Sequence, residues 1–324
     1  MCRKGIQSLN YSSRKFLIIL FTCSLVLSCK PDSTPTPMAD NRQEREVAYP
    51  PEMEAHKDSF EKSELEYISI EATPSKTDPW QSKFLGSPYL LKDSPYPRGA
   101  DGKPLQLLAQ INFEDMPPLS SYPDTGILQF YISPFDSKDH VWGAYSYSAE
   151  PFIPEAYFRS MGDQRFFRVM YHNNVIKERK KLLTKLPSFK KGFMPIDKEA
   201  VLKFRAKTGY VSNDDYRFVK YFGMDAITFF DQFSENANDI GNQYYQFTYP
   251  EGQAWIGGYA TFAQGDPRDI AKDEDWVLLL EIDSTFKNDL DILWGDAGVG
   301  TFFIRREDLE KKDFSRVIYY WDNY

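Results

Sequence analysis

Two apolar stretches in different halves of the chain resemble each other, and this repeat limits the possible folds more than any other feature. LLAQIN (residues 107–112) aligns with LLLEID (278–283) at an offset of 171 in the numbering. FYI (130–132) aligns with FFI (302–304) at an offset of 172. Runs rich in aliphatic and aromatic residues favour strands. We therefore expect two similar β units that pack about a pseudo-twofold axis.

The fold class follows from this repeat and from the turns around it. Gly86 and Gly257 precede the two stretches at the same offset as LLAQIN and LLLEID. The repeats would then cover about residues 82–133 and 253–304, although two unrelated hairpins with similar β-propensity would give the same pattern. We predict an α+β fold, in which two similar antiparallel β units form a β-rich core and a few helices lie between them. An internal duplication would explain this core.

Helical patterns occupy the middle of the chain. We predict helices over 174–186, 199–206, 214–222 and 225–236, the last with an aromatic face. A short helix and an aromatic strand are expected within 308–324. Further strands are predicted at residues 66–71, 104–113, 126–133, 164–172 and 276–283.

The N-terminus has the pattern of a lipoprotein signal. Arg14 and Lys15 precede an apolar run (16–28) that is too short to span a bilayer comfortably, and the run ends at Cys29. The sequence VLSC resembles a lipobox, in which Cys29 would carry palmitate and other acyl chains. An ordinary signal peptide that happens to contain a cysteine is the alternative. We therefore expect lipid anchoring to a membrane of the bacterial cell envelope, on its periplasmic or surface side.

Three regions follow from this signal. Residues 1–28 would be removed, 29–64 would form a flexible lipid-anchored tether, and 65–324 would form a single domain. Removal of the four basic residues before Cys29 leaves 35 basic and 47 acidic residues, a net charge of −12. This charge argues against a nucleic-acid partner. The mature domain would contain no cysteine for a disulfide, a metal site or nucleophilic catalysis.

Catalytic motifs are scarce. The sequence has no G-x-S-x-G elbow, no H-E-x-x-H pair and no phosphate-binding loop, so we expect no metal and no cofactor. His140 and His172 are the two histidines of the predicted fold, and His172 ends an apolar strand. A catalytic role therefore depends on carboxylates, for which the candidates are Asp266, Glu281 and Asp296. Asp296 has a simpler role as a turn residue.

A binding cleft is the other candidate site. Glycines allow close approach of backbone to a ligand, and aromatic and polar side chains accompany them near residues 253–268 and 294–300. The binding-cleft candidates are Trp255, Tyr259, Gln264, Arg268, Trp294 and Gly295.

An ordered set of blocks resembles the YwqG-like family of bacterial proteins. The blocks include SKFLGSPYL, PLQLLAQINF, GGYATFAQGDPRD and WGDAGVGTFFI, and the resemblance covers about residues 67–324. It implies an α+β fold with an extended β core, an uncharacterised biochemical role and no known cofactor. The lipoprotein signal departs from the mostly cytosolic family. Gln253 and Ala254 stand where members often carry a histidine, so an activity that needs this histidine is not expected.

Three functions remain open. The absence of motifs favours a tethered module that binds a protein or peptide, such as an immunity protein against a toxin, over an enzyme. A carboxylate-dependent hydrolase is the second hypothesis, and it requires two of Asp266, Glu281 and Asp296 in one pocket. Carbohydrate binding through Trp255, Tyr259 and Trp294 is the third, and it requires an exposed aromatic platform.

Overall fold

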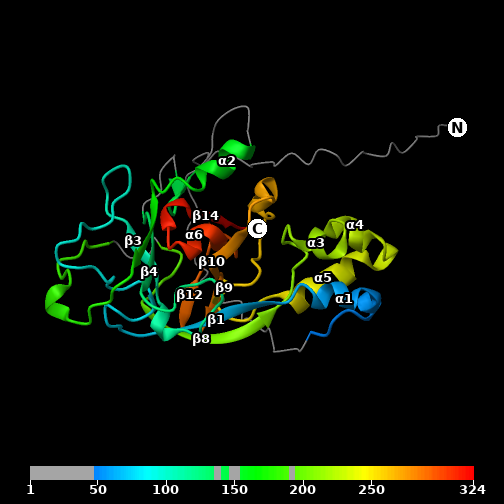
Figure 1. Ribbon diagram of the computed structural model, residues 1–324, viewed down its shortest axis with the longest axis horizontal. Helices are drawn as coiled ribbons and strands as arrows, with labels where there is room; N and C mark the ends of the chain where they lie inside the picture. The colour runs from blue at the N-terminus through cyan, green and yellow to red at the C-terminus, as the bar shows by residue number, and fades with distance from the viewer. Residues whose placement is uncertain (1–46, 135–139, 146–153, 190–193) are drawn as a thin grey trace, which may run out of the picture. The chain divides into compact units, whose positions relative to one another are not determined.

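A ten-stranded antiparallel sheet forms the centre of the fold (Figure 1). The structure is a computed structural model that describes residues 47–134, 140–145, 154–189 and 194–324. The predicted signal peptide, Cys29 and the first part of the tether lie outside these residues. The strands run across the sheet in the order β14-β13-β10-β9-β1-β8-β2-β3-β4-β7. Their bounds are β1 (Leu65–Pro74), β2 (Lys83–Phe84), β3 (Gln106–Asn112), β4 (Ile127–Ile132), β7 (Phe167–His172), β8 (Ala200–Gly209), β9 (Ala254–Gly257), β10 (Trp276–Asp283), β13 (Val299–Arg305) and β14 (Ile318–Asp322).

The sheet consists of two similar halves that exchange their first strands. The first half consists of β1, β2, β3, β4 and β7, and the second of β8, β9, β10, β13 and β14, matched in chain order. The pairing order β2-β3-β4-β7 in the first half matches the order β9-β10-β13-β14 in the second. The first strands β1 and β8 pair with each other at the centre. Strand β1 then pairs with β9 of the other half, and β8 pairs with β2. Each half is therefore completed by a strand from the other.

The two halves also share their irregularities. Strand β3 shifts register against β4 between Leu107 and Ala109, and β10 shifts against β13 between Leu278 and Leu280, at the equivalent positions of the repeat. A β-bulge of this kind bends and twists its strand, so both halves bend at the same place. The structure confirms the predicted α+β class with a β-rich core of two similar antiparallel units.

The core lies where the two halves face each other. Phe130 of β4 lies 4.8 Å from Phe302 of β13, and Phe167 of β7 lies 5.2 Å from Tyr319 of β14, between ring centroids. All residues of β4 are buried, as are all but the last of β13, so both faces of these strands are covered. Strands buried on both faces have continuous apolar sequences, which explains runs such as ILQFYI.

An aromatic helical cluster packs beside the sheet (Figure 1). Met53 and Phe60 are buried in it, together with Phe218, Phe229 and Tyr244. The packed chain therefore begins before residue 65, within the segment that we assigned to the tether. The helices of the cluster are η1 (Pro51–His56), α1 (Lys57–Glu61), α3 (Phe218–Phe222), α4 (Ala226–Asp231), η4 (Ser234–Asn236) and α5 (Ala237–Thr248).

The remaining elements lie outside the large sheet and the helical cluster. Two small hairpins are formed by β5 (His140–Val141) with β6 (Ala144–Tyr145) and by β11 (Thr285–Lys287) with β12 (Leu290–Ile292). None of the helices within the described ranges is long and apolar enough to cross a membrane. The other helices are η2 (Phe113–Asp115), α2 (Pro154–Ser160), η3 (Arg179–Lys181), η5 (Pro267–Ala271), α6 (Arg306–Glu310) and η6 (Phe314–Arg316).

Two helix predictions are wrong. For the predicted helix 199–206, residues 200–206 belong to strand β8, whose sequence AVLKFRAKTG alternates apolar and charged residues with the period of a strand. Residues 174–186 contain only the short η3, although we predicted a basic helix. In this run only Leu182 is buried, so a helix would have no apolar face to pack against the core. The Lys/Arg run is an exposed surface, as its charge indicates.

Candidate functional site

The three candidate carboxylates have separate structural environments. Glu281 lies in β10 and is fully buried, Asp266 precedes η5 and is buried in an ion-pair network, and Asp296 is exposed in the turn before β13. Neither of the two cavities described below is lined by any of them. The hydrolase hypothesis required two of these residues in one pocket, and these cavities do not provide it.

Glu281 serves the loop beside its strand. Its Oε1 accepts hydrogen bonds from the Thr261 hydroxyl at 2.6 Å and from the Thr261 backbone N–H at 3.1 Å. Burial raises the pKa of Glu281 well above its usual range, despite these hydrogen bonds. A completely buried carboxyl group cannot contact a ligand from solvent without a conformational change.

Asp266 and Arg268 belong to a buried ion-pair network. The Arg268 Nε and Nη2 donate to the two oxygens of Asp266 at 2.8 and 2.7 Å, and Nη2 also donates to Asp215 at 2.8 Å. Arg217 makes a similar two-point contact with Asp215, at 2.8 and 2.7 Å. Although burial favours a neutral Asp215, the Arg217 and Arg268 guanidinium groups hold the pKa of this carboxyl well below its usual range. Arg268 is thus a buried anchor rather than the exposed cleft residue that we predicted.

The predicted aromatic platform is absent from the surface of the described residues. Trp255 and Trp294 are fully buried, and Tyr259 is 3% exposed. Trp255 donates its indole N–H to the Tyr259 carbonyl, and Trp294 packs between Trp142 and Trp321. These three side chains fill the core, which contradicts their predicted role in a sugar-binding cleft.

The turn from residue 294 to 300 is closed by an internal hydrogen bond and by one from Ser284. The Gly298 N–H donates to the Trp294 carbonyl at 2.8 Å, and the Ser284 hydroxyl donates to the Gly298 carbonyl at 2.6 Å. Gly295 is exposed at the tip of the turn, and Gln264 donates to the Asn323 carbonyl at the C-terminus. This turn supports the start of β13 and does not line either cavity.

Two adjoining cavities form the best candidate site. The first, which we call the Arg217 pocket, has a volume of about 330 Å³, and the second, the Glu310 pocket, has about 360 Å³. Arg306 lines both. The Arg217 pocket is lined by Glu64, Leu65, Glu66, Leu119, Ser120, Tyr122, Arg217, Gly257, Gly258, Val277, Leu278 and Arg306. The Glu310 pocket is lined by Glu274, Asp275, Arg305, Arg306, Glu307 and Glu310.

The repeat positions the Arg217 pocket. The pocket lies at the end of β9 and at the bulge of β10, where the register shift occurs. The Tyr122 hydroxyl donates to the Leu278 carbonyl at this bulge, at 2.6 Å. Gly257 has φ +76°, and a Cβ there would lie 2.8 Å from the Leu119 side chain, so the wall requires glycine. The glycine pair that the sequence indicated, Gly257 and Gly258, therefore does line a cavity.

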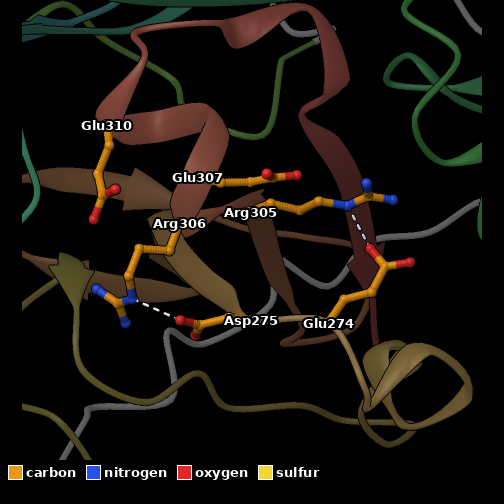
Figure 2. A pocket seen from close by; sticks show the side chains of 6 residues that line it. All are labelled: Glu274, Asp275, Arg305, Arg306, Glu307 and Glu310. Atoms are coloured by element: carbon orange, nitrogen blue, oxygen red, sulfur yellow. Dashed lines mark hydrogen bonds and ion pairs between the residues drawn. The ribbon is translucent and has the colours of Figure 1, made fainter.

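The Glu310 pocket is a charged surface hollow (Figure 2). Arg305 forms an ion pair with Glu274, and Arg306 contacts Asp275 at 2.7 Å. Glu307 and Glu310 project from α6 on the remaining wall, as Figure 2 shows. The hollow has four carboxylates and two guanidinium groups, so its net charge is negative.

The sequence did not indicate the arginines of these cavities. Arg217, Arg305 and Arg306 carry no motif, and Arg217 lies far in the chain from the adjacent Arg305 and Arg306. No group of three or more His, Cys, Asp or Glu side chains could hold a metal ion in the part of the chain that the structure describes.

The fold and these cavities define a class of protein: an α+β protein whose large antiparallel sheet is built from two strand-exchanged halves, with two surface cavities that share Arg306. The particular family is given by a family model for a domain of unknown function, DUF1963, which matches residues 82–323. The chain belongs to this family. No curated protein matches the chain.

Proposed function

We propose that this protein is a lipid-anchored module of the bacterial cell envelope that binds a protein or peptide partner. The single observation that carries the proposal is the pair of adjoining cavities that share Arg306. Their charged and apolar walls suit a polypeptide segment, which presents both kinds of group. The resemblance to the YwqG-like family, whose biochemical role is uncharacterised, is compatible with this role.

The uses of the candidate residues also support binding over hydrolysis. Glu281 and Asp266 form internal hydrogen bonds, and the Trp255 and Trp294 rings are buried. A toxin is one partner that an immunity-type module of this kind would bind. The acidic charge of the Glu310 pocket favours a partner with basic residues at this contact.

Site-specific photo-crosslinking in native membranes tests the binding role. A photoreactive residue at Ser120, which lines the Arg217 pocket, should form a discrete adduct. The same residue at Phe286, which is 56% exposed on β11 and lines neither cavity, is the matched control. The adduct should disappear when Arg306 is changed to Glu. Equal labelling at both positions, or an adduct that survives Arg306→Glu, would contradict the proposal.

Membrane fractionation tests the anchor separately. Cys29→Ala removes the thiol that would be acylated, so the protein should move from the membrane fraction to the soluble fraction or remain as an unprocessed precursor. Cys23→Ala, a cysteine within the predicted signal, is the control and should not change the distribution. An unchanged distribution of the Cys29→Ala protein would show that the lipoprotein assignment is wrong.

A further inference from the structure

We propose that the Arg217 pocket binds a single carboxylate group, held between the guanidinium groups of Arg217 and Arg306. This inference rests on the proposed function and names the chemical group of the partner that enters this cavity. The carboxylate belongs to the C-terminus of a polypeptide or to an acidic side chain. Two arginine guanidinium groups are the usual protein ligands for such a group.

Arg217 is fixed in position before any ligand binds. Its Nε and Nη2 donate to the buried Asp215, and Nη2 also contacts the Gly258 carbonyl at 3.3 Å. Its guanidinium lies 4.4 Å from the centroid of the Tyr259 ring. The side chain is only 15% exposed, yet it lines the cavity. Nη1 makes no hydrogen bond to any described residue, so this edge of a fully oriented guanidinium is available to an acceptor.

Arg306 lines the same pocket. Its Nε contacts Asp275 at 2.7 Å, and its Nη1 donates to the Ser121 hydroxyl at 3.2 Å. Tyr122 lies near both arginines: burial raises the pKa of its phenol, and the positive charges of Arg306 and Arg217 oppose this rise. The phenol donates its proton to the Leu278 carbonyl.

The charges around the pocket favour a carboxylate over a polyanion. Asp215 and Asp275 already neutralise most of the charge of the two arginines, and Glu66 adds a negative charge at the wall. The Glu64 carboxylate accepts a hydrogen bond from the Tyr210 hydroxyl. This bond connects Glu64 to the neighbouring helical cluster. Repulsion from these carboxylates grows with the charge of the ligand, so it opposes a singly charged carboxylate less than a doubly charged phosphate, and the carboxylate can take the unused donors. The volume of about 330 Å³ accommodates a group of one or two residues.

Titration with small probes tests the inference on the folded protein, by NMR chemical-shift changes at millimolar ligand concentrations. The probes are N-acetyl-dialanine, its C-terminal amide, the α-amide of N-acetyl-aspartate, whose side-chain carboxylate is free, and inorganic phosphate. Loss of a charge-assisted hydrogen bond costs about one order of magnitude in affinity. We therefore expect at least one carboxylate probe to bind about tenfold more tightly than the amide and than phosphate. The first and third probes distinguish a chain terminus from an acidic side chain.

Three variants locate the binding. Arg306→Gln and Arg217→Lys should each abolish the preference for the carboxylate over the amide. Arg217→Lys keeps a positive charge beside Asp215, and Arg306→Gln changes a partly exposed side chain. At least one of the two variants should therefore test the site in a folded protein. Arg305→Gln is the matched control, because Arg305 lines only the Glu310 pocket and its variant should keep the preference.

Several results would overturn the inference. They are the absence of shifts with every carboxylate probe, equal binding of acid and amide, phosphate as the best ligand, or equal losses in Arg305→Gln and Arg306→Gln. If the Ser120 adduct still forms in membranes after such a result, the binding role stands and only the carboxylate assignment fails. If carboxylate binding is found but no adduct forms, the site is real and the proposed polypeptide partner is not.

Discussion

Equivalent residues of the two halves carry different chemistry at one buried position. Gln110 of β3 and Glu281 of β10 occupy the same place in the repeat, both at 0% exposure. Each accepts a backbone N–H from the neighbouring loop, from Tyr89 at 2.8 Å and from Thr261 at 3.1 Å. The neutral amide also donates to the Pro79 and Gln81 carbonyls. The first half thus shows that an amide fits this position, whereas the second half places an ionisable group there.

The pH dependence of stability follows from Glu281. Its folded-state pKa is raised above the usual value of 4.5 by burial, so the folded protein keeps a proton that the unfolded chain releases. The contribution of Glu281 to the free energy of unfolding is therefore highest below about pH 4.5. This contribution is lost as the pH rises from there through the folded-state pKa. Glu281→Gln should remove this loss and stabilise the protein by at least about 1 kcal/mol at pH 8.

Urea unfolding at pH 5 and pH 8 measures this effect. The gain from Glu281→Gln should be larger at pH 8 than at pH 5, since wild-type Glu281 is still protonated at the lower pH. Glu310→Gln, on the exposed face of α6, is the control and should change stability by less than about 0.5 kcal/mol at both values. A destabilised Glu281→Gln protein at pH 8 would show that the charged form is required.

At the scale of elements, β13 depends on a tight approach to its neighbours. Gly298 precedes β13, and a Cβ there would lie 1.7 Å from the Asp322 carbonyl oxygen of β14. A Cβ on Gly300 would lie 2.3 Å from the Trp294 ring. Backbone cannot move aside as a flexible side chain can. The glycines of the WGDAGVG turn therefore allow β13 to approach and pair with β14.

Substitution of this glycine tests its packing role. Gly298→Ala should lower the free energy of unfolding by at least about 2 kcal/mol, because the new methyl group overlaps a backbone atom of the edge strand. Gly162→Ala is the control: its nearest neighbours are 3.5 Å away, and it should change stability by less than about 1 kcal/mol. Chemical denaturation measures both. Similar stabilities for the two variants would mean that β14 can move away from the turn.

At the scale of the whole molecule, the exchange of first strands makes β1 essential to both halves. The family match begins at residue 82, after β1 has ended. Yet β1 lies between β8 and β9 at the middle of the sheet and contributes Ile68, Ile70 and Ala72 to the main core. Without it, β8 and β9 each lose one of their two partners, and no strand pairing joins the parts of the sheet on either side of it.

Truncation tests this dependence. A fragment of residues 47–324 should unfold cooperatively, whereas a fragment of residues 75–324, which contains the whole family match, should not. Removal of a central strand leaves unpaired backbone groups and exposed apolar surface, so the shorter fragment should aggregate or show no near-ultraviolet circular dichroism. A cooperative unfolding transition in the 75–324 fragment would show that the halves associate without β1.

The sequence by itself determined the strands and their repetition. Runs such as LLAQIN and LLLEID are local patterns, and the nearly constant offset between matching blocks predicted two similar units. The same local reasoning failed for 199–206, because a possible helix cap at Asp197 outweighed the strand-like alternation of KFRAK. It also failed for 174–186, where a helical composition has no apolar face to pack.

Only the tertiary structure decided which residues face solvent and which meet in a cavity. Trp255, Trp294 and Arg268 have the composition of a binding cleft, but they are buried because distant strands cover them. Arg217 and Arg306 lie far apart in the sequence and become neighbours of Tyr122 only when the helical cluster, β9 and β10 come together. Burial and the meeting of distant side chains are set by long-range packing, which a local pattern does not encode.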